Sequence, residues 1–416
     1  NRYGVIVRPT LSFDEAGHKK NRISYFVLGI GEDVTSPQYI WPTQEEFTGE
    51  AGDLESPEAV FKNLTPRENT PIQGKEAMAG LKFRERLLKP GEGASYILIL
   101  GITEDEKEIN SLFKKFNTPD KVLGALRKTE AWWQKRSAQI KISTGERDFD
   151  NWGQWVNAQP LLRKIAGCSF LPDFDYGRGG RGWRDLWQDC LSLILNNPAE
   201  VRKMLIDNFR GVRIDGSNAT IIGKKPGEFI ADRNNIPRVW MDHGIWPLFT
   251  IQLYIHQSSD FRILLEETTY FKDRQLSRSK EQDPCWSPEG KNLLTTRSGK
   301  AYKGTVLEHL LVENLVQFFN VGEHNFILLE GADWNDGLDM ASQNGEAVAF
   351  SSLYARNLRG IIDILRRLPQ DNLRVLKEAL ILLDTVSGKK TDYSESGPKN
   401  ALLEKFGYEP KEMSET

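Results

Sequence analysis

The sequence predicts a mainly α-helical protein with an N-terminal β part. Short β-prone runs between turns rich in Gly, Pro and Asp occupy residues 1–104. Residues 105–147 carry apolar positions at helical spacing with charges between them, and residues 148–416 alternate helical patterns with long loops. We therefore expect a β-sandwich (1–104), or the C-terminal part of one, then a helical linker (105–147) and a helical catalytic domain (148–416).

The expected strands of the N-terminal part are residues 24–30, 79–84 and 95–101. The turn signal at 89–93 precedes the last of them, as is usual between sandwich strands. In the linker, Thr118 offers an N-cap and is followed by Pro, which favours the first position of a helix.

The C-terminal part shows helical spacing in seven segments and few strand patterns. The expected helices are 148–166, 184–196, 198–209, 239–257, 302–320, 349–368 and 370–386. Loops at 176–182, 211–228 and 272–300 carry the unusual residues, and 389–398 is polar and turn-like. This pattern predicts an (α/α)6 barrel with its site in loops at one end. Seven helices are fewer than a closed barrel of six hairpins needs, so the barrel is expected to be incomplete in this chain.

Composition excludes several classes of protein. The 416 residues have a formal net charge of −3 and a pI near 6.1, which gives no reason to expect nucleic acid or an anionic membrane as partner. Cys168, Cys190 and Cys285 match no metal-ligand spacing, and we expect reduced thiols in a cytoplasmic protein. No apolar segment reaches membrane-spanning length. The chain opens without Met and without a signal-peptide pattern, and it is expected to begin partway through a longer protein.

The tryptophans favour a carbohydrate-active protein. Ten of the eleven lie between residues 130 and 335, although most are expected to be core residues. One of them, Trp334, stands in the acidic stretch 329–339 directly after an apolar run. An indole face can cover the C–H face of a pyranose, while carboxylates such as those of Asp333 and Asp336 take hydroxyls or supply a proton. The alternative is a loop whose Asp and Asn side chains bond their own backbone.

A second constellation occupies residues 173–185. Its glycines allow the backbone to approach a ligand closely, and Arg178, Arg181 and Asp185 supply fixed donors and an acceptor for hydroxyls. Asp189 shares a helix face with Asp185 at i, i+4. The alternative is a helix N-terminus whose acids balance the macrodipole and the neighbouring arginines.

A third constellation combines two polar loops with a histidine. Asn218 and Asp232 lie in loops rich in short polar side chains, which suit several sugar hydroxyls or simply satisfy one another. His243 follows Asp242, but no second His stands at ligand spacing. We therefore predict no metal site, and a packed or hydroxyl-binding His243.

No Gly-x-Ser-x-Gly elbow, P-loop or dinucleotide fingerprint is present. The run Ala332-Asp333-Trp334-Asn335-Asp336-Gly337 and the Gly-Arg-Gly run leading into Trp183-Arg184-Asp185-Leu186-Trp187-Gln188-Asp189 instead resemble glycoside hydrolase family 94, the inverting β-glucoside phosphorylases. The resemblance implies a β-sandwich, a helical linker, an (α/α)6 barrel and a C-terminal jelly-roll lobe.

The resemblance also implies roles for individual residues. Asp336 resembles the catalytic general acid, with Trp334 beside it in the sugar site. Asp185 resembles the acid that holds the non-reducing-end glucose. The upstream Arg of the family corresponds to Arg178, but the spacer to Asp185 is one residue longer than the family pattern, which leaves Arg181 as a rival.

The stretches around Asp185, Asn218 and Asp232 look most like the 1,2-β-oligoglucan (sophorooligosaccharide) phosphorylases. The implied partners are a β-gluco-oligosaccharide, inorganic phosphate as co-substrate and α-glucose 1-phosphate, in a homodimer and without a cofactor. The phosphate-binding and acceptor-site residues of the family lie downstream of the acid and are expected beyond residue 416. The chain is therefore expected to be a segment of a phosphorylase of twice its length or more.

Three alternatives stay open at this point. One is a phosphorylase for cellobiose, cellodextrins or β-1,3-glucan oligomers. Another is an inverting hydrolase, which would need a base such as Glu228 or Asp232 to activate water. The last is a glucan-binding protein without catalysis.

Overall fold

The computed structural model divides the chain into two compact units; for the described residues, unit 1 ends at Gln139 and unit 2 begins at Ile140. The predicted domain boundaries after residues 104 and 147 stay predictions. The structure describes residues 1–9, 23–50, 52–166, 183–219, 221–222, 226–230, 239–287, 292–331, 341, 343–370, 372–384, 388 and 391–406.

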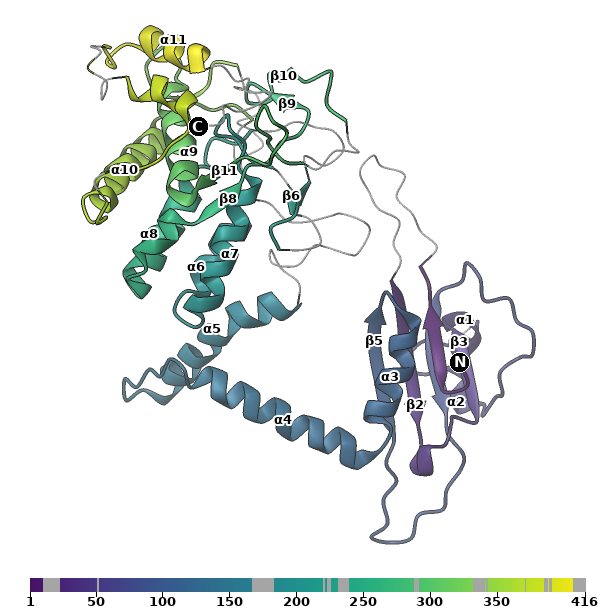
Figure 1. Cartoon of the computed structure of the whole chain (residues 1–416). Helices are drawn as coiled ribbons and strands as arrows, with labels where there is room; N and C mark the ends of the chain where they lie inside the picture. Colours follow the sequence, from purple (N-terminus) through teal and green to yellow (C-terminus); the bar gives the residue numbers. More distant parts are fainter. Residues whose placement is uncertain are drawn as a thin grey trace. The chain divides into compact units, whose positions relative to one another are not determined.

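A three-stranded antiparallel sheet forms the centre of unit 1, residues 1–139 (Figure 1). β1 (Gly4–Val7) and β5 (Ile97–Thr103) pair with opposite edges of β2 (Ser24–Ile30). The predicted strand at 24–30 is confirmed, and the one at 95–101 is shifted by two residues.

A smaller sheet pairs β3 (Tyr39–Thr43) with β4 (Ala77–Lys82), near the predicted strand at 79–84. The remaining elements of this part are short: η1 (Glu32–Val34), α1 (Gln44–Thr48) and α2 (Glu58–Phe61). Two sheets agree with the predicted β part, although a sandwich is a finer statement than these strands support.

Two helices complete unit 1. The apolar face of α3 (Glu106–Phe116) buries Ile109 against Phe26 of the central strand. α4 (Pro119–Ser137) begins with Pro at its first position after Thr118, as predicted. The fixed φ of Pro suits a helix, and the N–H group that Pro lacks would have no partner within the first turn. The Thr118 side chain makes no capping hydrogen bond.

Unit 2, residues 140–416, is mainly helical (Figure 1). Its helices are α5 (Arg147–Ala166), α6 (Trp183–Leu193), α7 (Pro198–Asn208), α8 (Ile245–Ser258), α9 (Val306–Phe319), α10 (Val348–Leu365) and α11 (Ser396–Phe406). Its 3-10 segments are η3 (Phe209–Gly211), η4 (Phe261–Leu265) and η6 (Lys377–Leu383). Four two-stranded ribbons pair β6 (Ile221–Ile222) with β7 (Phe229–Ile230), β8 (Glu267–Thr269) with β11 (Lys303–Thr305), β9 (Gln275–Leu276) with β10 (Glu281–Gln282), and β12 (Ile327–Leu328) with β13 (Glu346–Ala347).

The helices of unit 2 pack around a buried core. α9 is apolar around most of its circumference and is buried between α8, α10 and α11. Trp183 and Trp187 of α6 are about fully buried and pack edge to face, with ring centroids 5.7 Å apart. These two rings are therefore core residues, whereas Trp132, Trp152 and Trp155 are exposed, so the expectation that most tryptophans are core residues is not confirmed.

The helix predictions for unit 2 are confirmed in six of seven segments, with shifted ends. The segment 370–386 is the exception, because its described part forms the 3-10 segment η6. The sequence prediction also missed α11, whose first residues fall in the stretch predicted as a turn. The described helices do not close a barrel, so the mainly α character stands and the (α/α)6 architecture stays a prediction.

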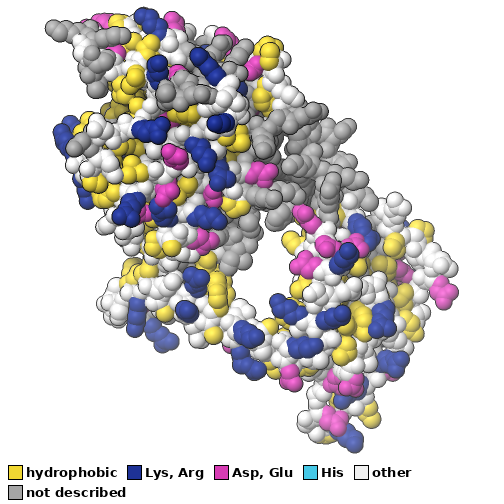
Figure 2. Space-filling view, viewed as in Figure 1, with side chains coloured by type: hydrophobic (Ala, Val, Ile, Leu, Met, Phe, Trp, Pro, Cys, Tyr) yellow, Lys and Arg dark blue, Asp and Glu magenta, His cyan; other side chains and the backbone are white. Residues whose placement is uncertain are grey.

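Charges of both signs are mixed over the surface. On the face shown in Figure 2, Lys and Arg side chains stand among Asp and Glu side chains in both units. In the described part of the chain, no helix has the length and apolar character that a membrane crossing requires.

Candidate functional site

Three of the predicted site residues lie in the described part of unit 2: Asp185, Asn218 and His243. The other predicted site residues lie outside the described residues, namely Asp336, Trp334, Asp333, Arg178, Arg181 and Asp232. The site can therefore be built from the first three and from the neighbours that hold them.

The start of α6, which carries Asp185, is bound to the turn that precedes α8. Arg184 Nε donates to Asp242 Oδ2 at 2.5 Å, and both side chains are at most 5% exposed. Trp183 Nε1 donates to the carbonyl oxygen of His243 at 3.1 Å. These two contacts bring the helix end of Asp185 next to the His243 turn, although 58 residues separate Arg184 from Asp242 in the sequence.

The Trp240 ring contacts both His243 of this turn and Arg184 of α6. Its ring centroid is 5.0 Å from that of His243, and the Arg184 guanidinium carbon lies 5.5 Å from the indole centroid. A guanidinium over an indole gains a cation–π attraction that is stronger away from water. The packing around His243 is therefore aromatic on one side.

Asn218 and His243 are in direct contact, which the sequence did not indicate. Asn218 Nδ2 donates to Glu313 Oε1 at 2.9 Å, so the Asn218 amide oxygen faces His243 Nδ1 at 3.2 Å. An amide oxygen only accepts, and His243 therefore carries its proton on Nδ1. Its Nε2 is left as an acceptor, and this atom is buried with no hydrogen-bond partner.

Burial sets the charge of this cluster. It lowers the pKa of the His243 imidazole to about 4, with Asp242 opposing the change, so the ring is neutral at pH 7. Burial also raises the pKa of the Glu313 carboxyl well above its usual range, which favours its neutral form. Burial works against ionisation of Asp242 as well, but His243, Arg184 and Trp246 outweigh it and lower the Asp242 pKa.

The segment leading to Asp336 begins beside the same turn. Glu330 forms an antiparallel bridge with Trp240, and Gly331 N donates to the Val239 carbonyl oxygen at 2.8 Å. A Cβ on Gly331 would also lie 2.8 Å from that oxygen, so the close approach requires Gly. The described chain thus places the entry to the acidic stretch next to the His243 turn.

A buried arginine holds Glu330. Arg278 Nε and Nη2 donate to the two carboxylate oxygens of Glu330 at 2.7 and 2.5 Å, with side chains 2% and 9% exposed. The Arg278 backbone N–H donates to Asp215 Oδ2 at 2.7 Å. A fork-to-fork pair fixes orientation as well as distance.

The sequence prediction missed Glu313 and Arg278. Glu313 is 1% exposed within the buried helix α9, and a charged residue type among apolar positions was the available signal. Arg278 lies in the predicted loop 272–300, where nothing local distinguishes it from other polar residues.

These groups suit a polar, uncharged ligand better than a metal. The neutral His243 nitrogen and the Asp242 Oδ1 atom are acceptors, and Glu313 can donate in the neutral form that burial favours. Sugar hydroxyls both donate and accept, so such a set matches them. Among the described residues, His, Cys, Asp and Glu side chains do not gather in groups of three or more that could hold a metal ion.

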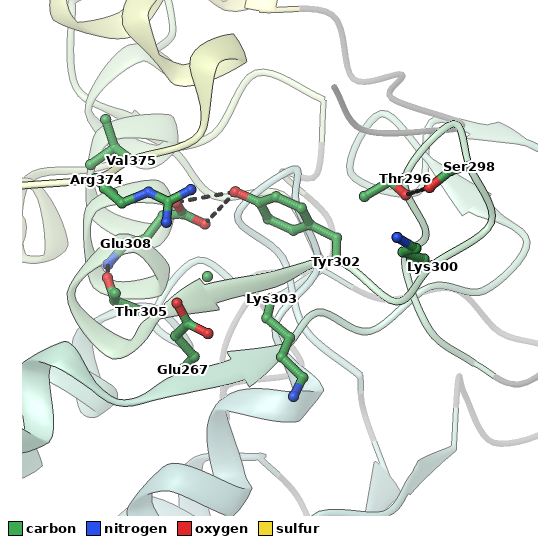
Figure 3. Close-up of a pocket in the computed structure, with 11 residues that line it drawn as sticks. Glu267, Thr296, Ser298, Lys300, Tyr302, Lys303, Thr305, Glu308, Arg374 and Val375 are labelled. Carbon is green, nitrogen blue, oxygen red and sulfur yellow. Dashed lines mark hydrogen bonds between the residues drawn. The ribbon is translucent and has the colours of Figure 1, made fainter. Parts of the chain in front are cut away.

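A separate polar pocket lies at the start of α9 (Figure 3). It has a volume of about 240 Å³, and Figure 3 shows the Tyr302 hydroxyl pointing at the Glu308 carboxylate with Arg374 beside it. Tyr302 donates to the carboxylate oxygens of Glu308 at 3.1 and 3.2 Å, and Tyr270 donates at 2.9 Å. Burial raises the Glu308 pKa to about 7, although both tyrosines oppose it. None of the three described site residues, Asp185, Asn218 and His243, lines this pocket.

Comparison with known proteins points to glycoside phosphorylases. The chain is 23% identical over 330 residues to solabiose phosphorylase of Paenibacillus borealis, covering 79% of this chain and 36% of that protein. It is also 23% identical over 310 residues to N,N'-diacetylchitobiose phosphorylase of Vibrio furnissii, covering 69% and 34%. This chain is a distant relative of glycoside phosphorylases.

A third relative is a synthase. Cyclic beta-(1,2)-glucan synthase NdvB of Rhizobium meliloti is 23% identical over 349 residues, which cover 81% of this chain and 12% of the synthase. The chain therefore spans about a third of the length of the phosphorylases, and less of the synthase. No family model matches the chain.

Proposed function

We propose that the protein containing this chain catalyses inverting phosphorolysis of β-linked gluco-oligosaccharides. The observation that carries the proposal is the meeting of three sequence stretches around the His243 turn: the start of α6 with Asp185, the loop of Asn218, and the Glu330 entry to the segment of Asp336. The stretches that resemble the phosphorylases are two of these three. The names of the phosphorylase relatives support the same reaction class.

In the proposed reaction Asp336 is the general acid. A phosphate oxygen attacks C1 of the terminal glucose, the bond from C1 to the glycosidic oxygen breaks, and Asp336 delivers its proton to that leaving oxygen. Attack from the opposite face inverts C1, so a β-glucoside yields α-glucose 1-phosphate and an oligosaccharide shortened by one unit. Phosphate is already an anionic nucleophile, and the reaction therefore needs no second carboxylate to activate water.

Sugar binding is assigned to the other predicted residues. Asp185 and Arg178 or Arg181 would hold the terminal glucose, with Trp334 covering one face of its ring. Asn218, Asp232 and His243 would complete the hydroxyl contacts, together with Asp333. These roles stay predictions, and so do the homodimer and the cytoplasmic location.

We further propose β-1,2-linked glucan oligomers as the substrate. The stretches around Asp185, Asn218 and Asp232 favour this linkage, and one distant relative is a cyclic β-(1,2)-glucan synthase. Cellobiose, cellodextrin and β-1,3-glucan oligomers are the competing substrates. The competing hydrolase mechanism is less well supported by Glu228, because this side chain is exposed among the described residues.

The test incubates the full-length protein with β-1,2-, β-1,3- and β-1,4-linked gluco-oligosaccharides, each with and without inorganic phosphate. We expect phosphate-dependent α-glucose 1-phosphate from the β-1,2-linked oligomers, lost in Asp336→Asn. Release of free glucose without phosphate would overturn phosphorolysis and favour the hydrolase. Phosphorolysis of another linkage would overturn only the substrate proposal. Glucan binding that is unchanged in Asp336→Asn, without turnover in either protein, would favour the binding function.

A further inference from the structure

Arg278 connects two parts of unit 2 that carry predicted site residues. Its guanidinium forks onto both carboxylate oxygens of Glu330. Its backbone N–H donates to Asp215 Oδ2, and its Nη1 donates to the Asp215 carbonyl oxygen at 3.2 Å. One fully buried side chain thus holds both segments at once.

Glu330, the first partner of Arg278, lies close in the sequence to the proposed acid. Glu330 lies six positions before Asp336 in the sequence and directly before Gly331. The φ of Glu330, +52°, lies in the left-handed region. Residues other than Gly seldom adopt this conformation unless tertiary contacts support it. The Arg278 fork provides that support, because it restrains both oxygens of the carboxylate.

Asp215, the second partner of Arg278, lies in the loop of Asn218. Asp215 Oδ1 accepts from the backbone N–H of Ser217 at 3.0 Å and from its hydroxyl at 2.6 Å. Asn218 follows and bonds Glu313 and His243. The Asp215 contacts therefore order the turn from which Asn218 projects.

The backbone around Arg278 is itself unusual. Ser277, Arg278 and Ser279 have φ values of +52°, +56° and +65°. Three successive left-handed residues without a Gly are costly and persist only where tertiary contacts impose them. The ion pair with Glu330 and the bonds to Asp215 are the contacts that impose this turn.

We propose that Arg278 is a positioning residue: through Glu330 and Asp215 it sets the place of Glu330 and Gly331, which precede the stretch of Asp336 in the sequence, relative to the Asn218 loop. The kinetic consequence of this role rests on the proposed function. Lysine cannot replace the arginine, because an ammonium group is a point charge and cannot fork onto both carboxylate oxygens.

The first experiment measures kcat and KM of phosphorolysis for full-length Arg278→Lys. We expect kcat to fall about ten-fold or more, because a small displacement of an acid from its substrate is costly. We expect KM for the oligosaccharide to stay within about two-fold, because Arg278 is not assigned a substrate contact. Glu330→Gln is the second variant, since it keeps the shape of the pair but turns one acceptor into a donor that faces the guanidinium.

The second experiment is hydrogen exchange, which needs no activity. In Arg278→Lys we expect faster exchange in peptides covering 329–341 and 213–219, and unchanged exchange in α6 and α8. The control is Arg202→Lys, because the Arg202 guanidinium likewise forms ion pairs, here with the carboxylates of Asp260 and Glu266 at 2.7 Å each. The control is expected to change neither kcat nor exchange at 329–341.

Two results would overturn the proposal: kcat within about two-fold of wild type in a folded Arg278→Lys, or faster exchange spread evenly over unit 2. If Arg278→Lys does not fold, the same outcomes in Glu330→Gln decide the question. If the wild-type protein shows no phosphorolysis, the proposed function fails, and the exchange pattern alone then confirms or overturns the positioning role.

Discussion

Asn218 and Glu313 are joined by a 2.9 Å hydrogen bond inside unit 2, although 95 residues separate them in the sequence. The Asn218 amide donates to Glu313 and accepts from His243, so its orientation fixes the tautomer of the imidazole. A neutral amide thus connects an acid whose pKa is raised by burial with a neutral imidazole in the interior.

This bond predicts how Glu313 responds to substitution. Glu313→Gln keeps an acceptor for Asn218 and is neutral like the native acid, so the free energy of unfolding at pH 7 should change by about 1 kcal/mol or less. Glu313→Leu leaves the buried Asn218 amide without its acceptor and should cost about 1–3 kcal/mol more than the Gln variant. Urea unfolding of the full-length protein measures both. Equal losses in the two variants would show that the Asn218–Glu313 hydrogen bond does not stabilise the folded protein.

His243 should make the protein less stable in acid. Its pKa is about 4 in the folded protein and near 6.5 in the unfolded chain, so the unfolded chain binds the proton more tightly. The contribution of neutral His243 to the free energy of unfolding is complete above pH 6.5. It is lost as the pH falls through 4, and the full loss is about 3 kcal/mol. Unfolding free energies measured from pH 7 to pH 4 should show this fall in wild type and a smaller fall in His243→Gln. A fall of the same size in both proteins would assign it to other groups.

Glu308 should make the protein less stable as the pH rises. Burial raises its pKa from 4.5 to about 7, so the folded protein binds the proton more tightly than the unfolded chain does. This contribution is complete below pH 4.5 and is lost as the pH rises through 7. Glu308→Gln removes the titration and keeps an acceptor for Tyr302. Relative to this variant, wild type should lose up to about 3 kcal/mol between pH 4.5 and pH 8. A constant difference in thermal or urea unfolding over that range would rule out the raised pKa.

Gly331 should tolerate no side chain. An added Cβ would lie 2.8 Å from the Val239 carbonyl oxygen, so Gly331→Ala must move the segment that enters the acidic stretch away from the His243 turn. We expect phosphorolysis by the full-length protein to fall about ten-fold or more, and the free energy of unfolding to fall by about 1–3 kcal/mol. Gly299→Ala is a control for the assay, because no atom lies within 4 Å of the added Cβ. Its φ of +77° adds a local cost in stability. Full activity in Gly331→Ala would show that this close approach does not matter for the reaction.

Local features of the sequence determined much of the secondary structure. α4 begins at Pro119 and α7 at Pro198 because Pro has a preset φ and lacks only an N–H that a first turn leaves free. α9 follows from apolar spacing over one segment. These signals act between near neighbours, and so a single sequence contains them. The same is true of the acidic stretch with Trp334, whose residue types alone pointed to sugar chemistry.

Tertiary structure decided what those residues contact. Arg184 meets Asp242, Arg278 meets Glu330, and Asn218 meets Glu313 across 58, 52 and 95 residues. Chain topology sets such pairings, and no spacing rule predicts them. Burial then shifted the pKa values, because desolvation depends on everything that packs around a group. The segment 370–386 shows the same limit: its apolar spacing predicted an α-helix, but its described part is the 3-10 segment η6 packed against α9 and α11. Helical propensity is weak, and packing against neighbours overrides it.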